Sequence, residues 1–132
     1  MSLSWSEGPA PEIDEYIRLR DEAGMGSRSA EAARLGLAGG LFAVTVREDG
    51  ILIAMGRVTG DGGCHAQLTD IAVHPTRQGQ GIGTEIVARL VAWCERALPS
   101  SCFLSLIADP GAEALYLRAG FKQETGMGRR LE

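Results

Sequence analysis

Three glycines stand close together in the segment Gln78-Gly79-Gln80-Gly81-Ile82-Gly83-Thr84. An apolar, strand-like stretch precedes the segment and a periodic helical stretch follows it, so we expect it to form the turn that leads into a helix. Backbone amides in the first turn of a helix have no partner within the helix, and glycine lets a ligand approach the backbone closely. Together with the helix dipole, such amides can hold an anion, and a diphosphate is the natural candidate.

Two common phosphate-binding signatures do not fit this turn. The dinucleotide pattern G-x-G-x-x-G fails, because neither Thr84 nor Ile86 is a glycine. The P-loop pattern fails as well, because no Gly-Lys-Ser/Thr occurs and the only lysine, Lys122, lies far downstream. The sequence therefore disfavours a Rossmann dinucleotide site and an NTPase. A glycine turn that only permits a tight connection between strand and helix is the structural alternative.

Upstream of the turn, hydrophobic periodicity predicts two helices followed by three strands. The helices are expected over residues 12–23 and 29–37, and the strands over 41–47, 51–58 and 64–73. Asp49-Gly50 is a strong signal for a hairpin turn between the first two strands, and Pro75 ends the third. These strands are therefore expected to form an antiparallel meander.

Downstream of the turn, the pattern predicts a helix, a strand, a second helix and a last short strand. The expected elements are a helix over 83–98, a buried strand over 102–107, a helix capped by Asp109 with Pro110 at its first position and ending at Gly120, and a strand beginning at Phe121. Strand, helix and strand in succession imply a right-handed crossover, so residues 102–107 should lie parallel to residues 68–73. The expected fold class is α+β, with three layers and a mixed, mostly antiparallel sheet.

The glycine turn resembles the signature of the GNAT N-acetyltransferase superfamily, Gln/Arg-x-x-Gly-x-Gly/Ala, which Gln78, Gly81 and Gly83 match. The segment Ile71-Ala72-Val73-His74-Pro75 precedes it, as a strand does in that family. Downstream, Tyr116 and Gly120-Phe121 also fit the family pattern, and Met55 to Gly63 is similar to a phrase of small bacterial members. The resemblance extends from about residue 12 onward.

The resemblance implies a single acetyl-CoA-binding domain over residues 1–132. Its twisted sheet would carry helices on both faces, and its central parallel strand pair would splay apart around the cofactor. Acetyl-CoA would be the cosubstrate, with no metal. The cofactor-binding residues implied in this way are Ala72, Val73, Gln78, Gly79, Gln80, Gly81, Ile82, Gly83, Thr84 and Asp109. Asp109 stands where the family usually has asparagine, so a helix-capping role is the alternative for it.

Acetyl transfer to an amine needs a base, stabilisation of an oxyanion, and an acid for the departing thiolate. By the resemblance, Tyr116 would be the acid and the backbone amide of Val73 the oxyanion donor. Asp70 is the only carboxylate on residues 64–73 and is the candidate base. A structural role for Asp70, as a hydrogen-bond acceptor, is an equal alternative. Asp61, in the glycine-rich turn before that strand, and a water chain are further candidates.

The amino-acid composition limits the classes of partner that the chain is expected to bind. The net charge of −4 and a single basic doublet, Arg129-Arg130, argue against nucleic acid. No apolar run approaches the roughly 18 residues of a membrane span, and the N-terminus has no secretion signal, so a cytoplasmic location is expected. Three cysteines without metal-ligand spacing disfavour a metal site or a disulfide framework.

The function predicted by this resemblance is direct acetyl transfer, through a tetrahedral intermediate, to a small-molecule or peptide amine acceptor. The alternative is a non-catalytic acyl-CoA-binding or assembly module, favoured by Asp109 and by the short segment after Gly120. That segment leaves little chain to wall the acceptor site and leaves a sheet edge open. A homodimer, in which a second copy supplies the wall, is therefore also expected.

Overall fold

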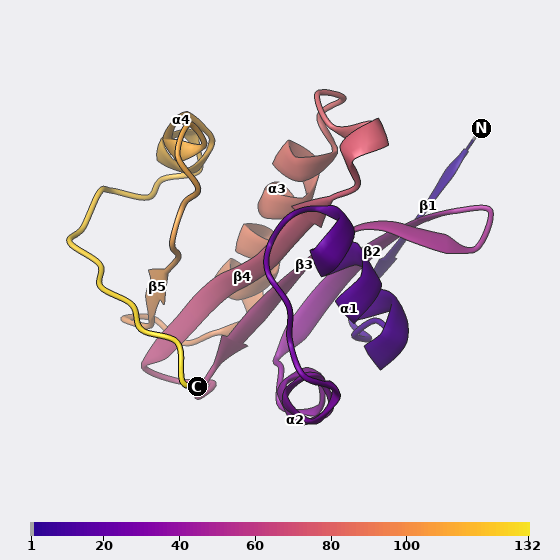
Figure 1. Ribbon diagram of the computed structural model, residues 1–132. Helices are drawn as coiled ribbons and strands as arrows, with labels where there is room; N and C mark the ends of the chain where they lie inside the picture. The colour runs from indigo at the N-terminus through magenta and orange to yellow at the C-terminus, as the bar shows by residue number, and fades with distance from the viewer. Residues whose placement is uncertain (1) are drawn as a thin grey trace.

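A five-stranded sheet lies between two layers of helices in the computed structural model, which describes residues 2–132 (Figure 1). Met1, part of the predicted 1–132 domain, is outside the described residues. The strands are β1 (Leu3–Glu7), β2 (Phe42–Glu48), β3 (Ile51–Gly60), β4 (His65–Val73) and β5 (Phe103–Ser105), and they lie in that order across the sheet. The helices are α1 (Ile13–Glu22), α2 (Ala30–Ala38), α3 (Ile82–Ala97) and α4 (Glu113–Arg118), with a short 3-10 turn, η1, at Pro75–Arg77.

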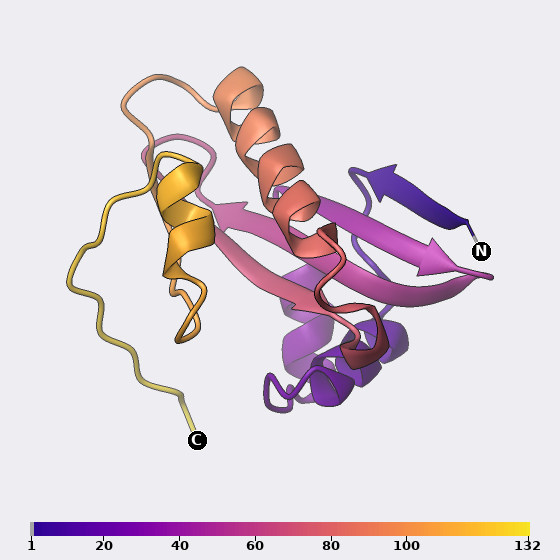
Figure 2. The ribbon, with the colours of Figure 1, turned by 90° about the horizontal axis from the view of Figure 1, so that it is seen from above.

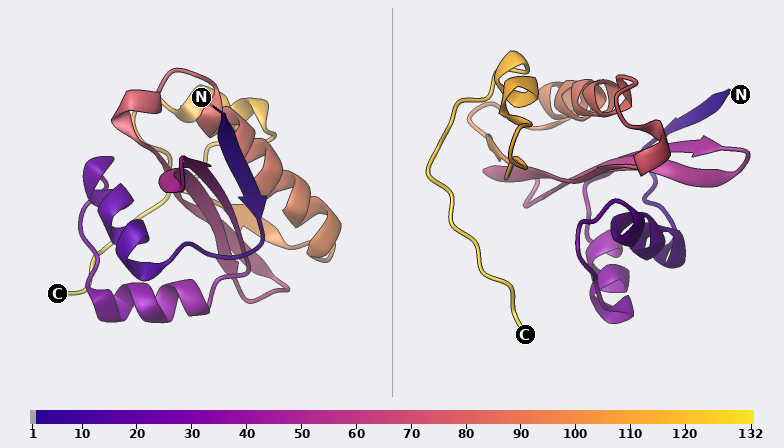
Figure 3. Two further views of the ribbon diagram at one scale, coloured as in Figure 1. Left: turned by 90° about the vertical axis from the view of Figure 1, so that its right-hand side faces the viewer. Right: turned by 45° about the horizontal axis from the view of Figure 1, so that its top comes forward.

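The layers confirm the predicted fold class. Strands β1 to β4 pair antiparallel and β4 pairs parallel with β5, so the sheet is mixed and mostly antiparallel. Helices α1 and α2 cover one face, and α3 and α4 cover the other (Figure 3). No helix among residues 2–132 is long and apolar enough to cross a membrane.

Each face of the sheet carries its own apolar core, because consecutive strand residues point to opposite faces. Under α3, the helix residues Ile86 and Leu90 pack against sheet residues such as Val58. On the other face, Leu19 of α1 packs with Met55 of β3 and Ala72 of β4. The 3.6-residue period of α3 is what brings its apolar stripe onto the sheet.

A β-bulge in β4 changes which face its side chains occupy. Met55 pairs with Ala72 and Arg57 pairs with Thr69, so two residues of β4 stand opposite Gly56 alone. Asp70 has a positive φ of 54° there. Before the bulge, the even-numbered Leu68 packs in the α3 core, whereas after it Ala72 packs in the α1 core. Asp70 therefore faces α1, on the same side as Ala72.

The parallel strands stay together for only three residue pairs. His65 to Gln67 pair with Phe103 to Ser105, and the rest of β4 has no strand on that side. Figure 1 shows β4 continuing past the short β5, with α4 and its connection set apart from it. The apolar run predicted that β5 would extend to residue 107. It ends at Ser105 instead, because the two strands separate there.

Three further differences from the predicted elements occur at the ends of the chain. Leu3–Glu7 adds an unpredicted strand that pairs with β2. The predicted cap at Asp109 is wrong: α4 is capped at Ala112, because Gly111 has a φ of 90° and interrupts helical geometry after Pro110. The strand predicted at Phe121 is also absent, since residues 121–132 form neither helix nor strand and run away from the sheet (Figure 2).

Candidate active site

The predicted anion-binding turn connects β4 to α3. Gly79 and Gly81 have φ values of 77° and 84°, in the left-handed region that favours glycine, and Gly81 is the N-cap of α3. Within residues 2–132, no amide from Gly79 to Thr84 donates a hydrogen bond to a protein group. These amides stand at the positive end of a 16-residue helix. The turn therefore has the free donors that an anionic ligand needs.

The open side of β4 leads directly into this turn. The amide of His74 donates to the carbonyl of Ile53 at 2.7 Å, toward β3. Because backbone groups alternate sides along a strand, the N–H and C=O of Val73 face the opposite side, where β5 has diverged. The Gln78 side-chain amide donates to that Val73 carbonyl at 3.1 Å. The Val73 N–H is thus available along the gap between the parallel strands.

A small pocket of about 150 Å³ opens beside this gap. Its lining brings together Asp70 of β4, Tyr116 of α4 and Asp109 of the preceding loop, all of them candidates from the sequence. Tyr116 packs edge-on against Phe121, with ring centroids 6.3 Å apart. Burial, and to a lesser degree the charge of Asp109, raises the pKa of the Tyr116 phenol. Its hydroxyl therefore stays protonated at neutral pH and can act as a proton donor.

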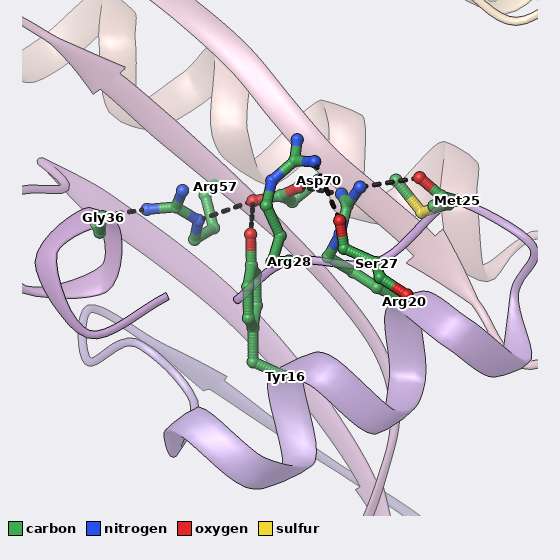
Figure 4. A network of polar contacts seen from close by, with 8 residues as sticks. All are labelled: Tyr16, Arg20, Met25, Ser27, Arg28, Gly36, Arg57 and Asp70. Atoms are coloured by element: carbon green, nitrogen blue, oxygen red, sulfur yellow. Dashed lines mark hydrogen bonds and ion pairs between the residues drawn. The ribbon is translucent and has the colours of Figure 1, made fainter. Parts of the chain in front are cut away.

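Asp70 is the centre of a buried polar network (Figure 4). Its carboxylate accepts hydrogen bonds from the Tyr16 hydroxyl at 2.7 Å, from Arg20 at 2.5 Å and from Nε of Arg57 at 3.0 Å. The exposed fractions of Asp70, Arg20 and Arg57 are only 6%, 3% and 7%. Burial raises the pKa of the Tyr16 phenol, and its hydrogen bond to Asp70 adds to this effect.

The two arginines carry the network into the surrounding backbone. Arg20 donates to the carbonyl of Met25 at 2.7 Å, in the loop between α1 and α2. Arg57 donates to the carbonyl of Gly36 at 3.2 Å, in α2. The network therefore ties α1, α2, β3 and β4 together at the bulge. It contains two guanidinium groups and one carboxylate, so a positive charge remains in excess.

The similarity of this chain to known proteins identifies its family. The family model described as "Acetyltransferase (GNAT) family" matches residues 3–121. The chain belongs to the GNAT acetyltransferase family. A protein of unknown function from meticillin-resistant Staphylococcus aureus, named a "probable acetyltransferase", is 36% identical with a TM-score of 0.91, and the match covers 98% of this chain and 100% of that one.

More distant GNAT relatives agree in fold. A GNAT family protein of Streptococcus pneumoniae has a TM-score of 0.79 at 18% identity over 98% of both chains, which shows the fold alone. An uncharacterised N-acetyltransferase of Pyropia yezoensis is 25% identical over 81% of this chain and 63% of its own length. One of Porphyra purpurea is 31% identical over 53% of this chain and 39% of its own. The chain thus spans less than two thirds of these curated relatives.

In this GNAT chain, Asp70 and Asp61 occupy different settings. The carboxylate of Asp70 accepts hydrogen bonds from three donors. Of its two predicted roles, base and structural hydrogen-bond acceptor, this geometry favours the second. Asp61 lies in the turn before β4, at the opposite end of the strand from the glycine turn. Its Oδ1 accepts from the amides of Gly63, Cys64 and His65 at 2.8, 2.9 and 3.1 Å, which lowers its pKa. It holds the turn together.

The partners of Asp70 were missed at the sequence level. Tyr16 and Arg20 are one helical turn apart on α1, and Arg57 interrupts an otherwise apolar strand. A charge on a buried face requires an opposite charge, and Asp70 was the only carboxylate on the neighbouring strand. This mismatch between charge and expected burial was the available signal. Arg28, which lines the pocket, gave no such signal because it lies in a polar loop.

Proposed function

We propose that this chain is an acetyl-CoA-dependent N-acetyltransferase that acts on a small amine or amino group. The observation that carries the proposal is the continuity of three features along β4: free amides at Gly79–Thr84, an unpaired backbone edge at Val73, and a pocket containing Tyr116. These features would suit a ligand that carries, in the same order, a diphosphate, an extended arm with amide groups and a reactive group. Family membership supports the same ligand.

Binding would use main-chain groups more than side chains. The amides of Gly79, Gln80, Gly81, Ile82, Gly83 and Thr84 would hold the pyrophosphate at the start of α3. The pantetheine arm would lie along the open edge of β4 beside Ala72 and Val73, in the place of an added strand. Gln78 supports this edge through its bond to the Val73 carbonyl. Asp109, exposed beside Tyr116, would meet the reactive end of the cosubstrate.

The chemistry would be direct transfer. The amine nitrogen attacks the thioester carbon, forming the C–N bond and placing negative charge on the carbonyl oxygen, to which the Val73 N–H donates. The C–S bond then breaks, and the Tyr116 hydroxyl protonates the departing sulfur. The amine loses its proton to water, because Asp70 is already engaged by three donors and Asp61 by three backbone amides. Water then returns a proton to the Tyr116 phenolate, which completes the cycle.

Calorimetry with acetyl-CoA, followed by thiol release in the presence of a panel of amines, tests this function. Binding followed by thiol release that depends on an added amine is the expected result. Binding without thiol release for any amine would contradict the enzyme and favour the alternative, a non-catalytic acyl-CoA-binding or assembly module. Absence of acetyl-CoA binding would reject both.

We further propose that the chain is a homodimer in which a second copy covers the outer edge of β5. That edge has no strand beside it among residues 2–132. The exposed apolar side chains of Phe103, Ile107, Leu117 and Met127 lie on β5, on α4 and its preceding loop, and on the extended C-terminal segment. Light scattering at micromolar concentration should give twice the 14.0 kDa chain mass. A monomer would refute the proposal.

A further inference from the structure

Arg28 is the one half-buried arginine among residues 2–132 that has no carboxylate partner. Every other arginine that is not fully exposed lies within 4.0 Å of an acidic side chain; these are Arg18, Arg20, Arg47, Arg57, Arg77 and Arg89. The only hydrogen bond from Arg28 goes to the carbonyl of its neighbour Ser27, at 3.5 Å. A partly desolvated guanidinium without an anion is unfavourable, so its setting suits an anion supplied from outside.

The location of Arg28 indicates which ligand would carry that anionic group. Arg28 lines the 150 Å³ pocket together with Tyr116, the proposed acid. Asp70 lines the same pocket, and Figure 4 draws Arg28 together with the side chains of the Asp70 network. A group bound to Arg28 would therefore share the pocket in which the proposed transfer takes place.

The acidic residues of the same pocket do not neutralise Arg28. Asp70 is shared between Arg20 and Arg57, which together exceed its charge by one. Asp109 lines the pocket but forms no ion pair with Arg28. Arg20 also lines the pocket, and its buried Nε has no hydrogen-bond partner within the described chain. The residues that α1 and its following loop contribute to the pocket, Arg20, Met25 and Arg28, therefore include no carboxylate.

We propose that the amine acceptor carries an anionic group, a carboxylate or a phosphate, which Arg28 binds while the amino group lies toward Tyr116 and Asp109. The identification of this ligand as the acceptor rests on the proposed function. The pocket has a volume of about 150 Å³, so the part of the acceptor that enters it must be small. Arg28 is then a specificity-determining residue, and the planar guanidinium suits either oxyanion.

Calorimetry on the protein saturated with coenzyme A tests the inference, using two matched ligand pairs. Glycine is compared with glycinamide, and O-phosphoethanolamine with ethanolamine; the two pairs distinguish a carboxylate from a phosphate. In at least one pair the anionic member should bind about tenfold more tightly or better, as for one charge-assisted hydrogen bond. Arg28→Gln should reduce this ratio to about one, Arg28→Lys should retain part of it, and the control Arg34→Gln, at an exposed arginine of α2, should leave it unchanged.

Equal binding within both pairs, or a ratio unaffected by Arg28→Gln, would overturn the inference, as would the absence of any binding by the anionic ligands. Thiol release from acetyl-CoA separates this failure from failure of the proposed function. Release with amines but without preference for the anionic member leaves the acetyltransferase standing and removes the role of Arg28. An Arg28-dependent preference in binding without thiol release supports the anion site and rejects the enzyme.

Discussion

At the scale of single residues, burial decides which polar side chains are available for chemistry. Asp70 and Tyr116 line one pocket, yet the carboxylate of Asp70 is held by three donors, whereas the hydroxyl of Tyr116 has no hydrogen-bond partner among residues 2–132. Arg28 and Asp109 share the pocket without pairing. The residues with unused hydrogen-bonding capacity are those expected to contact substrates.

Tyr116→Phe should lower kcat by about 100-fold, the lower end of the range for a general acid, with little change in acetyl-CoA affinity. The ring and its edge-on contact with Phe121 are retained, so the fold should not change. Steady-state kinetics and calorimetry together measure the two effects. An unchanged kcat would remove Tyr116 from the mechanism.

The pH dependence follows from the same phenol. Because burial raises the pKa of Tyr116 above its ordinary value of 10.0, the protonated, donating form is still the major form at pH 10. A pH–rate profile of the wild type should therefore show no decline attributable to this group between pH 7 and pH 9. A decline in that range that disappears in Tyr116→Phe would contradict this assignment.

At the scale of elements, the β4–α3 connection depends on backbone conformation. Gly81, the N-cap of α3, has a φ of 84°, whereas Gly83 lies in the first turn of the helix with ordinary helical geometry. A Cβ at Gly83 would meet Val73 Cγ2 at 3.8 Å, an ordinary contact. The two glycines therefore have different reasons for being in the turn, and the difference can be measured.

Gly81→Ala should destabilise the protein by roughly 1–2 kcal/mol, because an L-residue is strained in the left-handed region. Gly83→Ala, the matched control, should be neutral or stabilise by up to about 1 kcal/mol, because alanine loses less conformational entropy in a helix. Chemical denaturation of both variants without ligand gives the comparison. Equal destabilisation by the two substitutions would contradict the assignment of strain to Gly81.

At the scale of the whole molecule, the Asp70 network joins the helices on the α1 face to the sheet. It connects α1 through Tyr16 and Arg20 with β3 through Arg57, and it does so at the bulge that turns Asp70 toward α1. The same bulge lies beside the opening between β4 and β5. The stability of the fold and the shape of the pocket therefore depend on one buried anion.

Asp70→Asn should destabilise the protein by roughly 3–5 kcal/mol, because two buried guanidinium groups lose their counter-charge. Asp14→Asn, at an exposed carboxylate of α1, is the control and should change stability by about 0.5 kcal/mol or less. Urea unfolding measures both. If Asp70→Asn were as stable as the control yet inactive with acetyl-CoA and an amine, Asp70 would regain its candidacy as the base.

The sequence by itself determined the features that depend on local pattern. Periodicity predicted α1, α2, α3 and the strands β2, β3 and β4, and the spacing of Gln78, Gly81 and Gly83 indicated both the turn and the family. Strand–helix–strand order predicted the parallel pairing of β4 with β5, since crossover handedness leaves one arrangement. Such signals are contained within a few neighbouring residues and survive without knowledge of the fold.

Only the tertiary structure decided the features that depend on distant segments. The bulge opposite Gly56 fixes the face that Asp70 occupies, and no pattern within β4 reveals it. Tyr16 and Arg57 reach Asp70 from 54 and 13 residues away, and Arg28 of the α1–α2 loop lines the same pocket as Tyr116 of α4. Charge pairing and pocket composition are properties of packing, so they appear only when the chain is folded.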